Sequence, residues 1–294
     1  MKRGGYDIVV VPNVRNLLGE CPMWHPVEQC LYWVDTRKPA LQRLEHDGSV
    51  TLWPMPANIG SFVFRRSGGL VAGLKSGFSE IDLDPLSVVS RIHPEPQLPE
   101  NRLNDGRCDR SGRYWCGTRD PSNDHAGGSL YCLTPAFDVR RMDQGFIVPN
   151  GMAFSPDDRS LVFGCTRSDR IYKYDFDLES GEIGNRRVFI DTSGVPWRID
   201  GATFDEDGYY WAALIAGGAI GRFDGNGKLD RYINIPFSHP TMCNFGGKDL
   251  DVLYVTTGSV FVDDDERRRQ PLAGCMFAIR GLGVRGVPEP LFAG

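Results

Sequence analysis

The stretch Ser111-Gly112-Arg113-Tyr114-Trp115-Cys116-Gly117 joins a turn signal to a short β-rich phrase. Five more phrases of this kind occur in the chain: Leu31-Tyr32-Trp33-Val34, Leu70-Val71-Ala72-Gly73, Leu161-Val162-Phe163-Gly164, Tyr210-Trp211-Ala212-Ala213 and Leu253-Tyr254-Val255-Thr256. The first residues of the six phrases, counted from Tyr114 in the opening stretch, are 39, 44, 47, 49 and 43 positions apart along the chain. Short strands that recur about every 40–50 residues are the signature of a β-propeller. The sequence therefore predicts an all-β fold, a six-bladed β-propeller with a central channel.

The repeat runs along the whole chain, which predicts a single propeller domain over residues 1–294. A second strand follows several of the phrases, as in Ile171-Tyr172-Lys173-Tyr174 and Ile220-Gly221-Arg222-Phe223. A helical fold is excluded because no long stretch has apolar residues at helical spacing. A pair of β-sandwiches is the structural alternative.

Composition limits the partners of this chain of 294 residues. Its formal net charge of -5 gives no basic excess that would attract nucleic acid or an anionic membrane. No run approaches the ~18 apolar residues that cross a bilayer, and Ile8-Val9-Val10-Val11 is too short for a signal-peptide core. The eight cysteines include no C-x-x-C pair, so we interpret them as reduced, buried residues of a cytoplasmic protein. We expect a monomer or a weak homo-oligomer.

Polar side chains recur in phase with the repeat, 9 to 11 residues before each phrase. They are Glu20, Ser61, Asn104, Asn150, Asp200 and Asn244. Equal phase in a propeller means equal distance from the axis, so these groups should converge on one opening. Buried carboxylates and amides are costly unless paired, and a hard divalent cation would stabilise such an oxygen-only set. The alternative is that Asn150-Gly151 and Asp200-Gly201 are ordinary hairpin turns.

Several motifs resemble those of one family. They are Leu18-Gly19-Glu20-Cys21-Pro22-Met23-Trp24, Asn101-Arg102-Leu103-Asn104-Asp105-Gly106, Pro149-Asn150-Gly151 with Ser155-Pro156-Asp157, Asp200-Gly201 and Phe245-Gly246-Gly247. This pattern is similar to the senescence marker protein, gluconolactonase and luciferin-regenerating enzyme family, which includes regucalcin. One departure is Ile199, which stands where many members have Pro.

The resemblance implies a six-bladed propeller with one divalent metal ion at the mouth of the channel. The family's metal ligands fall on Glu20, Asn150 and Asp200, and its substrate contacts fall on Arg102 and Asn104. Asp120 is the nearest candidate for a further acidic substrate contact. Ca²⁺ is the first expectation for the ion, and Zn²⁺, Mn²⁺, Mg²⁺ and Fe²⁺ are the others.

The expected activity is a metal-dependent lactonase that hydrolyses a sugar aldono-1,4- or 1,5-lactone of the gluconolactone, arabinonolactone or xylonolactone type. The cation polarises the carbonyl and activates water, with Asp200 as general base. Whether Asp200 or a hydroxide on the cation is the base stays open. Arg102 would bind sugar oxygens or the developing oxyanion, and its alternative is an ion pair with Asp105 or Glu100. The alternative function is a non-catalytic, calcium-handling or ligand-binding scaffold.

Three other features need an interpretation. Trp24, Trp197 and Phe62 either wall the pocket or pack between blades. Gly281-Leu282-Gly283-Val284-Arg285-Gly286 fits a dinucleotide-binding pattern, but it lacks room for the helix and strand that pattern requires. The charge run 263–269 is expected to be a solvated loop.

Overall fold

The computed structural model describes residues 2–3 and 5–294 and divides the chain into two compact units. Unit 1 comprises residues 1–52 and 194–288, and unit 2 comprises residues 53–193 and 289–294. That the whole chain forms one domain remains a prediction.

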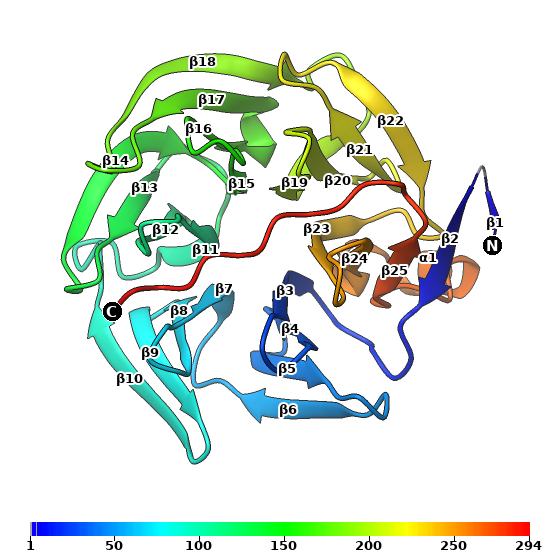
Figure 1. Ribbon diagram of the computed structural model, residues 1–294, viewed down its shortest axis with the longest axis horizontal. Helices are drawn as coiled ribbons and strands as arrows, with labels where there is room; N and C mark the ends of the chain where they lie inside the picture. Colours follow the sequence, from blue (N-terminus) through cyan, green and yellow to red (C-terminus); the bar gives the residue numbers. More distant parts are fainter. Residues whose placement is uncertain (1, 4) are drawn as a thin grey trace. The chain divides into compact units, whose positions relative to one another are not determined.

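Unit 2 contains three four-stranded antiparallel sheets, whose strands lie side by side in chain order (Figure 1). The strands are β7 (Ile59–Phe64), β8 (Leu70–Leu74), β9 (Gly77–Leu83) and β10 (Leu86–Ile92); β11 (Arg102–Cys108), β12 (Tyr114–Arg119), β13 (Gly128–Leu133) and β14 (Val139–Phe146); and β15 (Pro149–Phe154), β16 (Ser160–Cys165), β17 (Arg170–Phe176) and β18 (Ile183–Asp191). Each sheet is an antiparallel meander of four strands in chain order, which is the form of a propeller blade.

Unit 1 contains the other three sheets. The first of them consists of β3 (Gly19–His25), β4 (Cys30–Asp35), β5 (Ala40–Leu44) and β6 (Val50–Pro54), and the last residues of β6 belong to unit 2. The second consists of β19 (Arg198–Phe204), β20 (Tyr210–Ile215), β21 (Ala219–Phe223) and β22 (Leu229–Asn234). The third joins β23 (Pro240–Gly246), β24 (Val252–Thr257) and β25 (Phe277–Arg280) to β2 (Tyr6–Val10) and β1 (Lys2–Arg3). Strand β2 pairs with β25, from Asp7 opposite Arg280 to Val10 opposite Phe277. The N-terminal strand thus completes the last sheet.

Each repeated phrase lies in the second strand of its sheet, as the predicted repeat requires: β4, β8, β12, β16, β20 and β24. These strands are rich in the β-branched, aromatic and small residues that fit a pleated surface covered on both faces. All residues of β4, β16 and β24 are buried.

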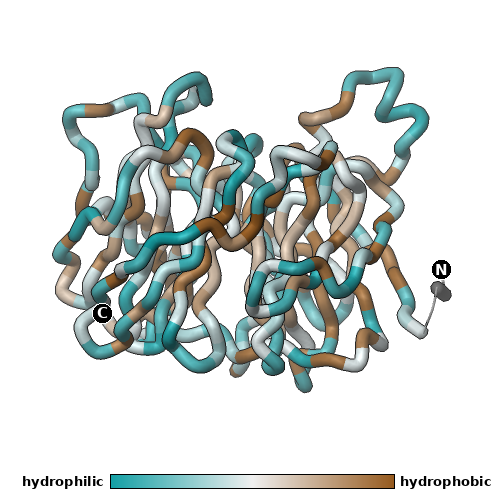
Figure 2. The backbone as a smooth tube through the Cα atoms, turned by 90° about the horizontal axis from the view of Figure 1, so that it is seen from above, coloured by the Kyte–Doolittle hydropathy of each residue, from teal (hydrophilic) through white to brown (hydrophobic). Residues whose placement is uncertain are grey.

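Burial decreases across each sheet. The first strands β7, β15 and β23 are buried throughout, whereas β10, β18 and β22 are mostly exposed. Figure 2 shows that apolar and hydrophilic stretches alternate along the chain. The first strand of a sheet is therefore where a polar side chain must find a partner.

A buried ionic cluster recurs in the two units. In unit 2, Asp109 accepts hydrogen bonds from Trp115 Nε1 at 2.8 Å and from Arg113 Nε at 2.6 Å. In unit 1, Asp205 accepts from Trp211 Nε1 at 2.8 Å and from Arg222 Nε at 2.8 Å. Each cluster ties the phrase Tyr-Trp to the turn before it, because the Asp lies six residues before the Trp.

The charge run forms a helix rather than the expected loop, α1 (Asp264–Arg269). Asp263 caps it by accepting a hydrogen bond from Glu266 N at 2.7 Å, and acidic residues in the first turn and basic residues in the last suit the helix dipole. The helix buries none of its residues, so the run is solvated as predicted. Two short 3₁₀ segments are η1 (Thr166–Ser168) and η2 (Ser259–Phe261).

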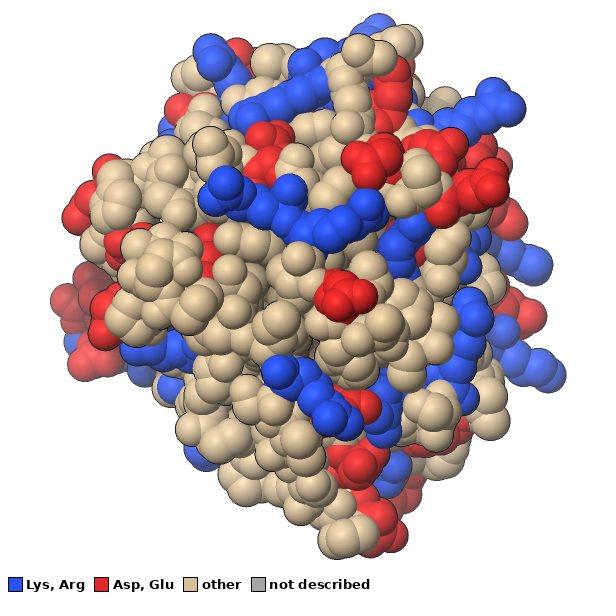
Figure 3. Space-filling view, turned by 90° about the vertical axis from the view of Figure 1, so that its left-hand side faces the viewer, with Lys and Arg blue, Asp and Glu red and all other residues tan. Residues whose placement is uncertain are grey.

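The surface carries charges of both signs. Figure 3 shows Lys and Arg interspersed with Asp and Glu on the face it presents. Ion pairs on unit 2 include Arg65 with Asp82 at 2.7 Å and Arg140 with Glu182 at 2.9 Å. Among the described residues, no helix has the length and apolar character that crossing a membrane requires.

Candidate functional site

In every sheet, the edge strand that directly precedes the repeated phrase carries a one-residue β-bulge close to its start. The register shifts lie between Glu20 and Met23, Ile59 and Ser61, Leu103 and Gly106, Asn150 and Ala153, Ile199 and Ala202, and Pro240 and Met242. A bulge re-aims side chains and interrupts pairing, which is why bulges are frequent at functional sites. Glu20 and Asn150 are the last paired residues before their bulges, and Asn104 and Asp200 lie within theirs.

The two dipeptides Asn150-Gly151 and Asp200-Gly201 lie inside strands β15 and β19. They are not the hairpin turns of the alternative interpretation. Gly151 has a φ of +70°, and Cys21, which follows Glu20, has a φ of +50°. The bulge therefore places a left-handed residue directly after both Glu20 and Asn150.

In unit 2, Asn104 and Asn150 are in direct contact. Asn104 Nδ2 donates to Asn150 Oδ1 at 2.9 Å and to the carbonyl of Pro149 at 2.8 Å. Asn150 Nδ2 donates to Thr166 Oγ1 at 2.8 Å. Thr166 thus fixes the amide of Asn150 so that its oxygen faces Asn104, and that oxygen keeps a second lone pair for a cation.

Asp105 of β11 binds the bulge that follows Asn150 in the neighbouring sheet. Its Oδ2 accepts a hydrogen bond from Met152 N at 2.8 Å, and burial raises the pKa of this carboxyl above its ordinary value. Its Oδ1 is buried and has no hydrogen-bond partner among the residues the structure describes. Asp105 is therefore not the ion-pair partner that sequence reasoning offered for Arg102, and the other candidate, Glu100, pairs with Lys75 at 3.0 Å.

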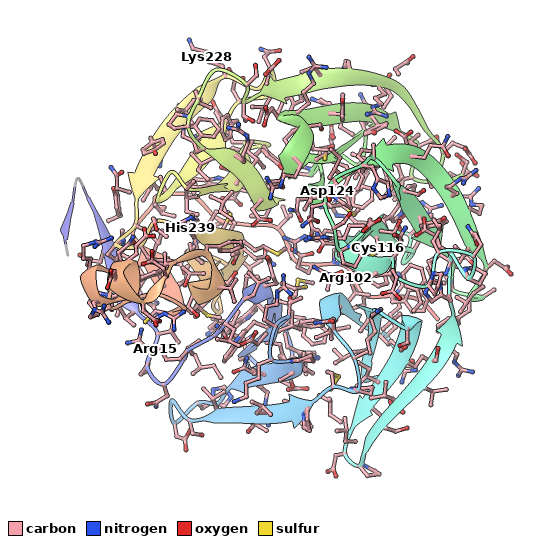
Figure 4. The ribbon with its side chains drawn as sticks, turned by 180° about the vertical axis from the view of Figure 1, so that it is seen from behind. Arg15, Arg102, Cys116, Asp124, Lys228 and His239 are labelled. Atoms are coloured by element: carbon pink, nitrogen blue, oxygen red, sulfur yellow. The ribbon has the colours of Figure 1, made fainter. Side chains whose placement is uncertain are left out.

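Arg102 begins β11, and its Nη1 donates to the carbonyl of Leu103 at 3.1 Å. It lies opposite Arg119, the last residue of β12, so the loop after β12 starts beside it. Figure 4 shows Arg102 and Cys116 in this sheet, with Asp124 on the loop beyond β12.

Asp120 belongs to that loop, and other residues of the loop bind its carboxylate. Its Oδ1 accepts from Ser122 N at 2.7 Å, and its Oδ2 lies 3.0 Å from His125 Nε2. The hydrogen bond from the main chain of Ser122, with smaller contributions including the charge of His125, lowers the pKa of Asp120. Asp120 is thus an ionised side chain on a loop at the same end of the sheet as Arg102.

Glu95 is a buried carboxylate that the sequence did not single out. It accepts hydrogen bonds from Asn101 Nδ2 at 2.7 Å, from Thr118 Oγ1 at 2.9 Å and from Tyr131 OH at 3.1 Å. Asn101 directly precedes Arg102, and Thr118 lies two residues before Asp120, so Glu95 fixes the starts of both segments. Burial, reinforced by Glu95, raises the pKa of Tyr131 to about 12. Glu95 lies outside the repeat phase, so no sequence signal pointed to it.

In unit 1, Glu20 and Asp200 lie on strands β3 and β19, and β23 contacts both strands. Met242 of β23 joins the two: Cys21 N donates to Met242 Sδ at 3.2 Å. A Cβ on Gly201 would lie 2.3 Å from Met242 Cγ. Glycine after Asp200 is therefore a packing requirement, because any larger residue would displace Met242.

The two remaining in-phase residues are structural. Ser61 is fully buried and donates to the carbonyl of Asn104 at 2.6 Å. Asn244 lies beyond the bulge of β23, deeper in the strand than its predicted phase, and donates to the carbonyl of Pro22 at 2.9 Å. Both side chains hold neighbouring sheets together.

The three aromatic candidates also make packing contacts. Trp24 stacks on Tyr254 of β24 with ring centroids 6.3 Å apart. Phe62 is fully buried against Phe64, and Trp197 packs against Phe223 at 6.4 Å.

The predicted ligands are of the kind that suits a hard cation. In unit 1, Glu20 and Asp200 carry carboxylate oxygens, and in unit 2, Asn150 carries an amide oxygen whose orientation Thr166 fixes. Among the described residues, no group of three or more His, Cys, Asp or Glu side chains could hold a metal ion.

Comparison with known proteins assigns the chain to a family. Residues 18–259 match the SMP-30/Gluconolactonase/LRE-like region. The chain belongs to this family. It is 38% identical over 282 residues to 6-deoxy-6-sulfogluconolactonase of Pseudomonas putida, covering 95% of this chain and 96% of that protein. It is 33% identical over 292 residues to regucalcin of Oryctolagus cuniculus, covering 94% and 95%.

Solved structures of the family share the fold. Regucalcin of Agrobacterium tumefaciens, described as a calcium-binding protein, superposes with a TM-score of 0.92 at 28% identity, covering 98% of this chain and 97% of that one. A luciferin-regenerating enzyme gives a TM-score of 0.92 at 26% identity, covering 99% and 100%. The predicted six-bladed β-propeller and the predicted family are both confirmed.

Proposed function

We propose that this chain is a metal-dependent lactonase that opens a sugar aldono-1,4- or 1,5-lactone to the aldonic acid. The observation that carries the proposal is the direct hydrogen bond between Asn104 and Asn150. It joins a side chain expected to touch substrate to one expected to hold a cation. The prediction of a lactone-hydrolysing enzyme agrees with the name of the relative that is 38% identical.

Glu20, Asn150 and Asp200 would hold the divalent cation, with Ca²⁺ as the first candidate. The cation would polarise the lactone carbonyl and acidify water. Two carboxylates balance its two charges, so the site stays electrically neutral before substrate binds.

Side chains of the protein would transfer the proton and bind the substrate. Water oxygen bonds to the carbonyl carbon, Asp200 accepts the water proton, and the ring carbon–oxygen bond breaks with return of that proton to the leaving oxygen. Asn104 would align the carbonyl or a neighbouring hydroxyl. Arg102 would donate to the sugar oxygens or to the oxyanion as charge develops. The ionised Asp120 would accept hydrogen bonds from sugar hydroxyls.

The test is a lactone panel followed with a pH indicator, because ring opening releases acid. The panel holds glucono-1,5-lactone, arabinono- and xylono-1,4-lactone and 6-deoxy-6-sulfogluconolactone. Dialysis against a chelator should abolish activity, and added Ca²⁺ or Mn²⁺ should restore it. Asp200→Asn should lose far more turnover than Arg102→Lys, while Asp249→Asn, an exposed residue of unit 1, should change nothing. Full activity in metal-free protein would contradict the proposal.

The second candidate is a non-catalytic propeller that binds a divalent ion. It is favoured by the structural neighbour described as a calcium-binding protein. Calcium binding by calorimetry without turnover of any lactone in the panel would establish this alternative.

We further propose that the protein works in a reducing compartment such as the cytoplasm. All eight cysteines are buried and none of them forms a disulfide in the part of the chain that the structure describes, which supports this proposal.

A further inference from the structure

Unit 2 contains a cavity of about 460 Å³ at the end of its sheets where the neighbouring strands β7 and β11 begin (Figure 1). Its lining comes from the loop before β7, the turn between β8 and β9 and the segment between β10 and β11. The lining residues are Ala57, Lys75, Ser76, His93, Pro96 and Pro99. Cavities of this size commonly hold small molecules. None of the six residues belongs to the proposed cation or lactone site, so the cavity has no role in the function proposed above.

The turn and the segment that line the cavity are packed against each other. Gly77 follows Lys75 and Ser76 and has a φ of +106°. A Cβ on Gly77 would lie 2.4 Å from the carbonyl oxygen of Ile92 and 2.8 Å from Cα of His93, so only glycine fits there. The turn that carries Lys75 and Ser76 is therefore held directly against the main chain of His93.

His93 and Ser76 bring hydrogen-bond donors to the cavity. The main-chain N of Glu95 donates to Nδ1 of His93 at 3.1 Å. A neutral imidazole that accepts at Nδ1 carries its hydrogen on Nε2. Within the described part of the chain, neither Nε2 of His93 nor the hydroxyl of Ser76 has a hydrogen-bond partner. Both groups are thus available to an acceptor on a ligand.

Lys75 adds a positive charge. Its Nζ lies 3.0 Å from Oε2 of Glu100, whose side chain is 77% exposed, while that of Lys75 is 41% exposed. An ion pair this exposed is weak, so an anion in the cavity can compete with Glu100 for the ammonium group. The six lining residues include this cation and no carboxylate. The charge of the lining therefore favours an anionic ligand.

The rest of the lining is apolar and held in place. Ala57, Pro96 and Pro99 offer carbon surface, which suits the skeleton of an organic molecule. Glu95 anchors the segment that carries the two prolines, because its buried carboxylate accepts hydrogen bonds from Asn101 and from β12 and β13. A wall that is already ordered loses less entropy when a ligand binds.

We propose that this cavity binds a small organic anion, a molecule with a carboxylate or phosphate group on a short carbon skeleton. The anionic group would accept hydrogen bonds from Lys75, Ser76 and His93. The carbon skeleton would lie against Pro96 and Pro99. Binding here uses none of the proposed lactonase residues, so it does not depend on lactone hydrolysis.

The experiment is calorimetric titration of the protein with gluconate, which carries a carboxylate, and with glucose 6-phosphate, which carries a phosphate. Glucose is the neutral probe. At least one of the two anions should bind, and glucose should not. Lys75→Gln should weaken binding of that anion by about 10-fold. Glu100→Gln should strengthen it by about 2–5-fold, because this change releases the ammonium group of Lys75. Lys228→Gln, at an exposed turn of unit 1, is the matched control and should change nothing.

Three results would overturn the inference. They are binding of neither anion, binding of glucose as tight as that of the anions, and anion binding that Lys75→Gln leaves unchanged. If Arg102→Gln abolishes binding that Lys75→Gln does not affect, the anion occupies the proposed active site instead. Lys75 and Glu100 are both partly exposed, so both variants should fold, and thermal unfolding checks this. Failure of the lactone panel would leave the anion titrations unaffected, so the two proposals fail separately.

Discussion

Asn104 donates a hydrogen bond to Asn150 across 2.9 Å, although 46 positions separate them in the chain. The same nitrogen also reaches the carbonyl of Pro149. One side chain thus orients another that is expected to bind a cation. A group that holds a ligand in place is commonly worth about 10–100-fold in metal affinity or activity.

Asn104→Ala should therefore weaken Ca²⁺ binding by about 10-fold or more and should cost about 1 kcal/mol of stability. Calorimetric titration of the metal-free protein with Ca²⁺ measures the first effect, and urea unfolding measures the second. Asn226→Ala, at an exposed turn, is the control. Unchanged Ca²⁺ affinity in Asn104→Ala would show that Asn150 does not depend on this contact.

Glu95→Gln should raise KM for the lactone by about 10-fold and leave kcat within about 3-fold, because the amide cannot accept from Asn101, Thr118 and Tyr131 at once. The loss of one buried acceptor should also cost about 1–3 kcal/mol. Steady-state kinetics and urea unfolding test both effects, with the exposed Glu179→Gln as control. A fall in kcat alone would contradict a positioning role for Glu95.

Asp205→Ala should destabilise the fold by about 3–5 kcal/mol, because Asp205 is fully buried and its loss leaves the buried Arg222 short of its closest partner. Asp230→Ala removes the other close partner of Arg222, at 2.9 Å, but Asp230 is partly exposed, so less than about 1 kcal/mol is expected. Guanidinium unfolding compares the two variants. Equal losses would mean that burial of Asp205 does not set the energy.

Native thiols should not react with a disulfide reagent at pH 8. Burial raises the pKa of Cys116 and of Cys132 to about 12, so both remain protonated and inaccessible far above neutral pH. Thiolate would form only as the pH approaches those values. Absorbance after addition of the reagent should show no fast reaction in the native protein and eight equivalents in guanidinium. A rapid equivalent in the native state would identify a cysteine that opens locally.

The sequence by itself determined the repeat, and its spacing selected the candidate site residues. Strand phrases and turn residues are local signals, because alternation and turn chemistry act over a few residues, so each phrase falls in the second strand of its sheet. The same spacing located Glu20, Asn104, Asn150 and Asp200 at the bulges.

Only the tertiary structure decided how distant segments meet. The pairing of β2 with β25, the hydrogen bond between Asn104 and Asn150, and the burial of Glu95 all join residues whose partners no local pattern names. Asn244 shows the limit of counting, since a bulge in β23 shifts the register and leaves this residue bonded to Pro22. A bulge shifts the register by one residue, so the side chains that follow it move to the other face of the sheet. The position of the bulge depends on packing between sheets and not on spacing along the chain.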